Sequence, residues 1–425
     1  MYYIGYDIGS SSVKAALVEA ETGKKVIVLN EPQSEMEILS IHPDWAEQDP
    51  EIWWQHICTA TKRAIREANI DASKIQGIGI SYQMHGLVIT DAAGNALRNS
   101  IIWCDSRAVE IGNTAFAEIG EQKCMEHLLN SPGNFTASKL KWVKENEPEV
   151  YNKIDKYMLP GDYIALKLTG EVTTTKNGLS EGMLWDYKEN KVADWLLDYY
   201  GIDQSLTPKI VENFTNQGIV TEKASKESGL PAGIPIVYRA GDQPNNALAL
   251  NVLNPGEVAA TGGTSGVFYA VSEMSSGKST RVNNFVHVNY ELETPRVGKL
   301  LNINGAGIQY RWLRNNMGNE SYEAMNEKAS NIEVGSEGVV VIPFGNGAER
   351  MFNNKNIGTH FLNLNLNIHN SAHLFRASLE GIAFSFVYGM ECLKEDNATI
   401  NVIRAGNDNL FRSEIFSNTV ATLIG

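Results

Sequence analysis

A glycine-led polar turn between two alternating stretches occurs twice in this 425-residue chain. The first, Asp7-Ile8-Gly9-Ser10-Ser11-Ser12, lies between residues 4–8 and 13–18, and the second, Thr261-Gly262-Gly263-Thr264-Ser265, lies between residues 257–260 and 267–271. Alternating apolar and polar residues predict strands, and a short Gly-rich segment between them predicts a β-hairpin. The two turns are more than half the chain apart, so the repeat predicts a duplicated domain and not a solenoid.

The predicted boundary between the two domains lies just before Gly241. Residues 1–240 then form an N-terminal domain and residues 241–425 a C-terminal domain. A buried-type strand at 234–238 precedes the boundary, and a helical pattern at 245–252 follows it.

Asp49-Pro50-Glu51 predicts a helix start, because Asp caps well, Pro fits the first position and an acid suits the first turn. The helix that follows carries Trp53 and Trp54, which we expect in the core.

The charge balance excludes several classes of partner. The chain has 36 Lys and Arg against 50 Asp and Glu, a net charge of −14. An acidic surface repels a phosphate backbone, so nucleic acid is not an expected partner. A triphosphate is not excluded, since one Mg²⁺ ion and a few directed N–H groups can hold it.

Targeting signals and cysteine usage bear on location. The sequence has no apolar run long enough to span a membrane and no signal-peptide pattern at its start. Its four cysteines form no CxxC pair. We therefore expect reduced thiols in a cytoplasmic protein with no membrane partner.

The first turn has the composition of a phosphate-binding hairpin. Gly9 permits a tight turn and a close approach of the backbone, and the serine hydroxyls and turn N–H groups can donate to phosphate oxygens. Lys14 adds a positive charge, and Asp7 can hold Mg²⁺ directly or through water. Short Gly/Ser patterns are common, so an ordinary polar hairpin turn is the alternative.

Asp242 follows the strand predicted at 234–238. The carboxyl ends of strands are where α/β folds place their chemistry. A carboxylate there can accept the proton of a substrate hydroxyl as that oxygen attacks phosphorus. The alternative is a helix N-cap, which Asp also serves well.

Three small-residue turns in the second half are candidates for nucleotide contact. They are Gly263-Thr264-Ser265-Gly266, the segment 304–309 and Ala405-Gly406-Asn407. None matches GxxxxGK[ST] or GxGxxG, so neither a P-loop nor a Rossmann fingerprint is present.

Two further segments are candidates for sugar contact. His85 could bond a sugar hydroxyl while Met84 packs on the apolar face of the sugar, and the alternative is a core Met beside a structural His. Asp105 and Arg107 could be a sugar-binding acid with its orienting partner, or a surface ion pair. The eight histidines show no metal-ligand spacing, so a structural zinc is not expected.

Together these pieces resemble the FGGY carbohydrate kinases, a branch of the actin/hexokinase/Hsp70-like ATPases. The likeness extends over nearly the whole chain, in order. The segments that carry it are IGYDIGSSSVKAALVE (4–19), WAEQDPEIWW (45–54), SYQMHGLVITD (81–91), IIWCDSR (101–107), SKLKWVKENEP (138–148), AGDQPNNALAL (240–250), GGTSGVF (262–268), NGAGIQYRWL (304–313) and HLFRASLEGIAF (373–384).

The resemblance implies two ribonuclease-H-like α/β domains with an interdomain cleft and an ATP- and Mg²⁺-dependent sugar kinase. It implies Asp242 as the general base and Asp7 as the acid near Mg²⁺. The phosphate positions it implies are Ser10, Ser11, Ser12 and Lys14 in the first hairpin and Gly263 and Thr264 in the second. It places Gly305, Gln309, Gly406 and Asn407 along the nucleotide, and Met84, His85 and Asp105 against the sugar. A homodimer is a further expectation from the family.

Within the family, QMHG (83–86) followed by WCDSR (103–107) is most similar to the xylulokinases, which implies D-xylulose and its 5-phosphate. The glycerol kinases differ at residues 82–85, so glycerol is not expected. Gln243 stands where xylulokinases usually have Asn, which leaves ribulose, gluconate or a related sugar as an alternative. A sugar- or nucleotide-binding protein without catalysis, or an ATPase acting without sugar, are the alternatives from other classes.

Two departures concern the C-terminal domain. Ala405-Gly406 replaces the usual Gly-Gly, and Asn407 and Asp408 replace small residues, which would alter contacts to adenosine. The sequence stops at Gly425, where the family normally continues with another strand and helix. We therefore expect a shortened C-terminal domain.

Overall fold

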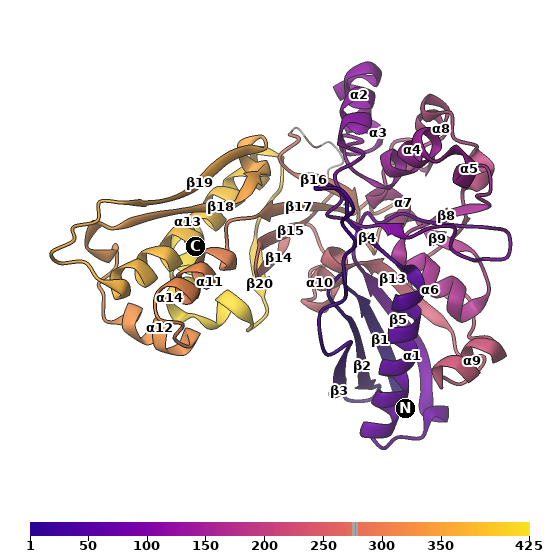
Figure 1. Cartoon of the computed structure of the whole chain (residues 1–425), viewed down its shortest axis with the longest axis horizontal. Helices are drawn as coiled ribbons and strands as arrows, with labels where there is room; N and C mark the ends of the chain where they lie inside the picture. Colours follow the sequence, from indigo (N-terminus) through magenta and orange to yellow (C-terminus); the bar gives the residue numbers. More distant parts are fainter. Residues whose placement is uncertain (274–276, 278) are drawn as a thin grey trace. The chain divides into compact units, whose positions relative to one another are not determined.

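The computed structural model describes residues 1–273, 277 and 279–425, which form two compact units (Figure 1). The first unit comprises Met1–Asn245 and Phe285–Leu292, and the second comprises Asn246–Asn284 and Glu293–Gly425.

A five-stranded sheet forms the centre of the first unit. Its strands are β1 (Tyr2–Ile8), β2 (Val13–Glu19), β3 (Lys25–Glu31), β5 (Ile75–Tyr82) and β13 (Ile236–Gly241), in the order β13-β5-β1-β2-β3. The first three strands run antiparallel, and β5 and β13 run parallel to β1. The parallel strands therefore bring their carboxyl ends to one edge of the sheet, beside the turn that joins β1 to β2.

Helices and short strands complete the first unit. The helices are α1 (Pro50–Glu67), α2 (Val109–Ile119), α3 (Glu121–His127), α4 (Thr136–Asn146), α5 (Pro148–Tyr151), α6 (Pro160–Thr169), α7 (Lys176–Glu181), α8 (Asp194–Tyr200) and α9 (Glu222–Ser228), with α10 (Asp242–Ala249) at the boundary between the units. The short strands are β4 (Glu47–Gln48), β6 (Val88–Thr90), β7 (Ser100–Ile101), β8 (Lys156–Met158), β9 (Thr173–Thr175), β10 (Trp185–Asp186), β11 (Lys191–Val192) and β12 (Lys209–Val211).

Helix α1 shows how local sequence and core packing agree. The Asp49 side chain accepts a hydrogen bond from the Glu51 N–H at 2.9 Å, and Pro50 is the first helical residue. Trp53 and Trp54 are both buried in the core that α1 forms with the sheet. The predicted helix start and the predicted core tryptophans are confirmed.

The second unit repeats the central part of this sheet. Its sheet strands are β14 (Glu257–Gly262), β15 (Gly266–Ser272), β17 (Val297–Ile303) and β20 (Val402–Ala405), together with β16 (Asn283–Val286), of which only the first two residues belong to this unit; the order is β16-β17-β15-β14-β20. β14, β15 and β17 run antiparallel and β20 runs parallel to β14, so these four strands correspond to β1, β2, β3 and β5. The predicted duplicated α/β domain, with a hairpin at each Gly-rich turn, is confirmed.

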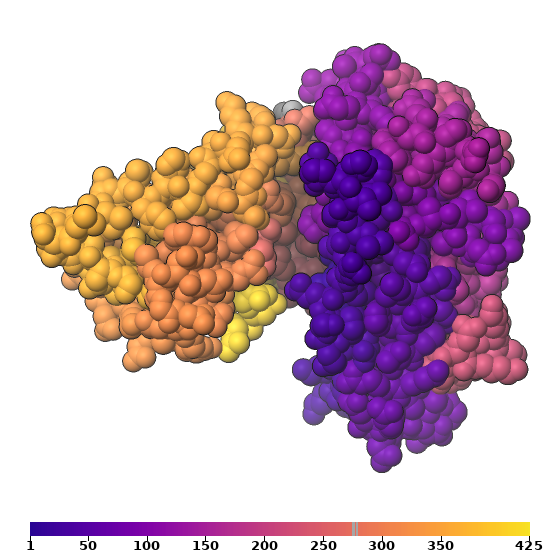
Figure 2. Space-filling model, in the orientation of Figure 1, coloured from indigo at the N-terminus to yellow at the C-terminus, as the bar shows by residue number. Residues whose placement is uncertain are grey.

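The other elements of the second unit are α11 (Gly307–Asn316), α12 (Tyr322–Ser330), α13 (Ser371–Glu395), α14 (Glu414–Ile424) and the strands β18 (Val340–Glu349) and β19 (Lys355–Leu362). Helix α13 packs on the sheet, and α11, α12, α14 and β18 pack against α13. Phe386 of α13 packs edge-on against Phe268 of β15, with ring centroids 5.1 Å apart. The β18–β19 hairpin is a separate two-stranded sheet that packs on α13, and its surface is yellow-orange in Figure 2.

The structure corrects the prediction near residue 240. The strand runs over Ile236–Gly241 and not over residues 234–238, and α10 begins at Asp242 and ends at Ala249 instead of running over residues 245–252. Because the strand passes directly into the helix, Asp242 is the first helical residue and follows the carboxyl end of β13 with no intervening loop.

Candidate active site

The first hairpin carries a charged pair at the edge of the sheet. Asp7 and Lys14 are directly opposite each other on β1 and β2, and Lys14 Nζ lies 2.9 Å from Asp7 Oδ2. The other carboxylate oxygen of Asp7 accepts a hydrogen bond from Ser81 Oγ at 3.1 Å. Asp7 is thereby fixed between β2 and β5, with about a third of its side chain exposed.

The turn itself is tight and open to solvent on one side. The Gly9 N–H donates to the Ser12 carbonyl at 3.1 Å, and a Cβ at Gly9 would lie only 3.1 Å from the same oxygen. Ser11 is exposed, while Ser10 and Ser12 are half-buried. The three hydroxyls and the turn backbone therefore form a small polar surface next to the Asp7 carboxylate.

Asp242 lies at the same edge of the sheet as Asp7. Asp7 pairs with Ser81 in β5, and Gly241 pairs with Tyr82, the next residue of that strand. Burial first, and then the charge of Asp7, raise the pKa of Asp242, while Gln243 and Lys14 lower it, and together these effects bring it to about 6. A carboxylate with this pKa is ionised at neutral pH and is a good proton acceptor.

The segment 83–86 comes directly after β5, at this edge. The Gln83 N–H donates to the Ile8 carbonyl at 2.8 Å, which ties the segment to the end of β1. Met84 is buried, and His85 has a left-handed backbone with φ of 61°. The His85 Nδ1 lies 3.0 Å from the carbonyl oxygen of Glu181. Met84 and His85 therefore lie in the same unit as Asp7 and Asp242, on a neighbouring strand end.

Asp105 and Arg107 form a buried network, so the alternative of a surface ion pair is wrong. Both side chains are fully buried, and Arg107 donates to both oxygens of Asp105 at 2.7–3.0 Å. Asp105 also accepts the Ala46 N–H at 2.6 Å, and the guanidinium of Arg107 lies over the ring of Trp45 at 3.8 Å. The contacts of Asp105 stabilise the loop before α2. Its contact with a sugar stays a prediction.

Three residues near these groups escaped the sequence analysis. Glu181, at the end of α7, is fully buried, and its carboxylate comes so close to Gly241 that a Cβ there would lie 2.4 Å from it. Burial first, and then the charge of Asp242, raise the pKa of Glu181 well above its usual range. Trp103 is half exposed, with its Nε1 3.5 Å from Ser10 Oγ.

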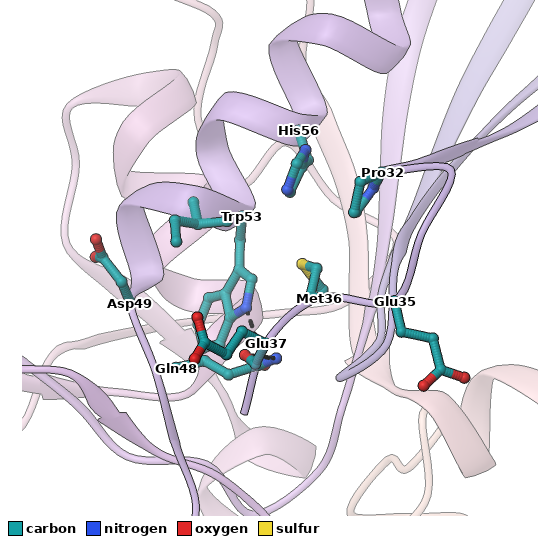
Figure 3. A pocket seen from close by; sticks show the side chains of 9 residues that line it. Pro32, Glu35, Met36, Glu37, Gln48, Asp49, Trp53 and His56 are labelled. Carbon is teal, nitrogen blue, oxygen red and sulfur yellow. Dashed lines mark hydrogen bonds between the residues drawn. The ribbon is translucent and has the colours of Figure 1, made fainter. Parts of the chain in front are cut away.

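The third residue, Gln48, connects the first hairpin to its surroundings. Its Nε2 donates to the Ser10 carbonyl at 2.6 Å and to the Glu37 carbonyl at 3.2 Å, and its Oε1 accepts from Trp53 and Gln83, each at 3.2 Å. Gln48 lies at the wall of a pocket of about 220 Å³ (Figure 3). The residues around that pocket are Pro32, Glu35, Met36, Glu37, Gln48, Asp49, Ile52, Trp53 and His56. The sequence around Glu181, at the end of a helix, and around Gln48, in a two-residue strand, gives no signal of such roles, because these depend on partners distant in sequence.

The second hairpin is covered by the start of α11. The N–H groups of Gly307 and Ile308 donate to the carbonyls of Gly263 and Thr264 at 3.1 and 3.0 Å. A Cβ at Gly307 would lie 2.3 Å from the Gly263 oxygen, so only glycine fits there. The turn and the helix thereby form one wall of a cavity.

This cavity of the second unit has a volume of about 670 Å³. That is large enough for a nucleotide-sized ligand, and pockets of 300–1,000 Å³ are typical of small-molecule sites. Its lining residues are Gly262, Gly263, Thr264, Gly307, Tyr310, Arg311, Tyr322, Glu323, Asn326, Glu327, Ser330, Leu379, Asn409, Leu410, Arg412, Ser413, Glu414 and Ile415. Most come from α11, α12 and the segment before α14. Of the lining residues, only Gly262, Gly263, Thr264 and Gly307 lie in segments whose sequence predicted phosphate or nucleotide contact.

The other predicted nucleotide positions lie outside this lining. The Gly305 N–H donates to Glu349 Oε1 at 2.7 Å, and buried Gln309 accepts from Thr359 Oγ1 at 2.9 Å. Gly406 and Asn407 follow β20, two residues before the lining residue Asn409. Their contact with a nucleotide stays a prediction.

No helix in the part of the chain that the structure describes combines the length and apolar character that crossing a membrane requires. Nor do three His, Cys, Asp or Glu side chains come together as a metal-holding group anywhere in residues 1–273, 277 and 279–425.

The models of two protein-family domains match the sequence of the chain. The N-terminal domain of the FGGY family of carbohydrate kinases matches residues 2–249, and the C-terminal domain of the same family matches residues 258–406.

Individual proteins match over most of their length. A xylulose kinase from Escherichia coli is 30% identical over 393 residues, which is 92% of this chain and 78% of that protein. The crystal structure of a xylulose kinase from Brucella ovis has a TM-score of 0.88 and 27% identity, covering 99% of this chain and 85% of that one. A gluconate kinase from Lactobacillus acidophilus has a TM-score of 0.84 with 22% identity, covering 99% and 84%, and shows the shared fold.

Proposed function

Because this chain belongs to the FGGY family of carbohydrate kinases, we propose that it transfers a phosphoryl group from MgATP to the terminal hydroxyl of a ketopentose, D-xylulose, giving D-xylulose 5-phosphate. The observation that carries the proposal is that Asp7, Asp242 and the segment 83–86 gather at one edge of the first sheet. The similarity to xylulose kinases supports the choice of sugar.

Asp242 is the proposed general base. Its pKa of about 6 keeps it ionised at neutral pH, yet close enough to neutrality to accept a hydroxyl proton. Met84 and His85 are the proposed sugar contacts, with the imidazole bonding a hydroxyl and the thioether packing against carbon. Asp105 is the third proposed contact, at the buried end of the same region.

The first hairpin is the proposed phosphate clamp of the first unit. The hydroxyls of Ser10, Ser11 and Ser12 can donate to phosphate oxygens, and Lys14 supplies a positive charge. Asp7 would hold Mg²⁺, directly or through water, and this fits the preference of Mg²⁺ for a carboxylate in a site completed by phosphates and water. Mg²⁺ would supply charge neutralisation at the transferring group.

The second unit is the proposed nucleotide-binding domain. Its cavity of about 670 Å³ begins at the turn Gly263-Thr264, where the absence of a side chain at Gly263 leaves room for a phosphate. Tyr310 and Tyr322, which stack with centroids 5.8 Å apart, offer aromatic surface beside it. ATP would supply the phosphoryl group. The boundary between the two proposed domains falls beside Asp242.

The test is sugar-dependent release of ADP from MgATP with a panel of D-xylulose, D-ribulose, L-ribulose, gluconate and glycerol. We expect release to be dominated by D-xylulose. Release dominated by another sugar would reject D-xylulose and point to Gln243 as the first residue to exchange, since it lies next to the base and its Nε2 donates to Asp242 at 3.3 Å. Binding of a sugar in calorimetry with no release for any of them would reject the kinase activity.

A further inference from the structure

His85 has an uncommon backbone conformation for a residue other than glycine. Its φ of 61° lies in the left-handed region, which only a few per cent of non-glycine residues adopt, His more often than most. Such residues persist only where the surroundings fix them, and they concentrate at functional sites. The contacts of His85 therefore show what fixes it.

The ring of His85 is fixed from α7 and by an aromatic neighbour. Its Nδ1 lies 3.0 Å from the main-chain oxygen of Glu181, and since a carbonyl only accepts, Nδ1 carries the proton. The ring also packs edge-on against Phe135 with centroids 4.7 Å apart. These contacts set the orientation of the imidazole and place the lone pair of the neutral ring on Nε2.

The main chain of His85 is fixed from α4 by Lys139. This lysine is fully buried, and its Nζ donates to the His85 carbonyl at 2.8 Å and to the Ile102 carbonyl at 2.9 Å. Ile102 directly precedes Trp103, whose indole lies near Ser10. One ammonium group thus joins the segment 83–86 to the segment 101–107.

The burial of Lys139 is not explained by an ion pair. Asp105, whose charge acts on it, binds Arg107 instead, and within the described residues Lys139 pairs with no carboxylate. Burial of the ammonium lowers the pKa of Lys139 to about 7, and the charge of Asp105 offsets only part of this effect. An apolar side chain would fill the space without the desolvation penalty of a charge, so the benefit must lie in the two carbonyls that the ammonium holds.

We propose that Lys139 is a positioning residue for sugar binding, which fixes the main chain of His85 and aligns it with the segment that carries Trp103. The inference rests on the proposed sugar contact of His85. Lys139 is not itself a proposed substrate contact, because its Nζ donates to two main-chain carbonyls.

The first test exchanges Lys139 for methionine, which keeps the length and removes the donors. We expect Lys139→Met to raise the KM for the sugar at least tenfold, with the KM for MgATP within twofold of the wild type. Lys141→Met is the control, because Lys141 lies on the same helix but is partly exposed and pairs with Glu145 at 3.0 Å. An unchanged sugar KM in folded Lys139→Met, or an equal rise in both KM values, would overturn the inference. If Lys139→Met does not fold, Lys139→Gln, which keeps an N–H donor, replaces it with a smaller expected rise.

The second test asks whether Lys139 acts through the His85 ring. His85→Ala should raise the sugar KM, and adding Lys139→Met to it should change that KM less than twofold, because no ring remains to be positioned. Effects that multiply would overturn the positioning role while leaving the sugar contact of His85 intact. An unchanged sugar KM in His85→Ala would reject the contact itself, and the inference with it.

Discussion

The two Gly-rich hairpins have the same strand topology, but the first carries a charged cross-strand pair and the second an uncharged one. In the first, Asp7 stands two residues before the turn glycine Gly9. It lies opposite Lys14 on the next strand and forms an ion pair with it at 2.9 Å. In the second, the corresponding cross-strand pair is Thr261 and Val267, which carries no charge. The first turn leads to a sheet edge with carboxylates, whereas the second leads to the N-terminus of α11 and a cavity.

The difference between the hairpins suggests different roles for the two units in the proposed reaction. Each hairpin supplies backbone N–H groups and hydroxyls at a turn, which suits phosphate in both places. Among the residues that the structure describes, only the first sheet continues past the parallel strand next to the hairpin, from β5 to β13, and this brings Asp242 to the same edge as Asp7. Proton transfer and metal binding are therefore expected of the first unit, and recognition of the neutral part of the nucleotide of the second.

The sharpest test of this division removes the base. Asp242→Asn keeps the shape of the side chain and removes its ability to accept a proton, so we expect kcat to fall about 10³-fold, within the usual range for general-base catalysis. Sugar affinity, measured by calorimetry, should change little. Turnover near that of the wild type would show that the first unit does not supply the base.

The pH profile tests whether Asp7 acts on Asp242. A base must be ionised, so kcat/KM should fall as the pH is lowered through about 6, the pKa of Asp242. Asp7→Asn removes a negative charge that raises this pKa and should move the acid limb to lower pH. Lys14→Met removes a positive charge that lowers it and should move the limb the other way. We expect both variants also to lose about tenfold or more in turnover through weaker binding of MgATP, so the position of the limb is the quantity to compare. If the acid limb stays at the same pH in both variants, the charge of Asp7 does not act on the pKa of Asp242.

Much of this fold followed from local sequence patterns. The two hairpins, the start of α1 and its core tryptophans were predictable, because strand alternation, turn glycines and helix caps act over a few residues. The start of α10 was not, since Gly241 and Asp242 resembled a loop whereas the strand passes straight into the helix. Tertiary packing decides this boundary: Gly241 lies against the carboxylate of Glu181 and the side chain of Met84.

The motifs of the candidate site were predictable from the sequence, but the residues that hold those motifs in place were not. Asp7, Asp242 and the segment 83–86 stand at strand ends, where the rules for α/β folds direct attention. Lys139, Gln48 and Glu181 each contact a residue far away in sequence, namely His85, Gln83 and Gly241, and no local pattern reveals such contacts. The lining of the cavity was missed for the same reason, because α11, α12 and the segment before α14 meet only in the folded unit.

A pair of alanine exchanges tests the second hairpin. At Gly263 a Cβ would meet nothing closer than 3.7 Å, so Gly263→Ala should leave the melting temperature nearly unchanged while it raises the KM for MgATP several-fold, by occupying the space proposed for phosphate. At Gly307 a Cβ would lie 2.3 Å from a backbone oxygen, so Gly307→Ala should lower the melting temperature by several degrees. Thermal melts and kinetics with MgATP measure both. Equal nucleotide affinity in Gly263→Ala and the wild type would remove this turn from the phosphate site.

The smallest expected effects come from single hydroxyls, and they compare the two turns most directly. Ser11→Ala and Thr264→Val each remove one proposed donor to phosphate, and the backbone contacts of both residues are unaffected, since the Ser11 and Thr264 carbonyls accept the N–H groups of Met36 and Ile308. A hydrogen bond contributes about 1 kcal/mol net, so each variant should raise the KM for MgATP about fivefold. If the two turns bind separate oxygens of one nucleotide, the effects should multiply in the double variant, to about 25-fold. An effect in Ser11→Ala alone would mean that the hydroxyl of the second turn serves the fold of its own unit and not the ligand.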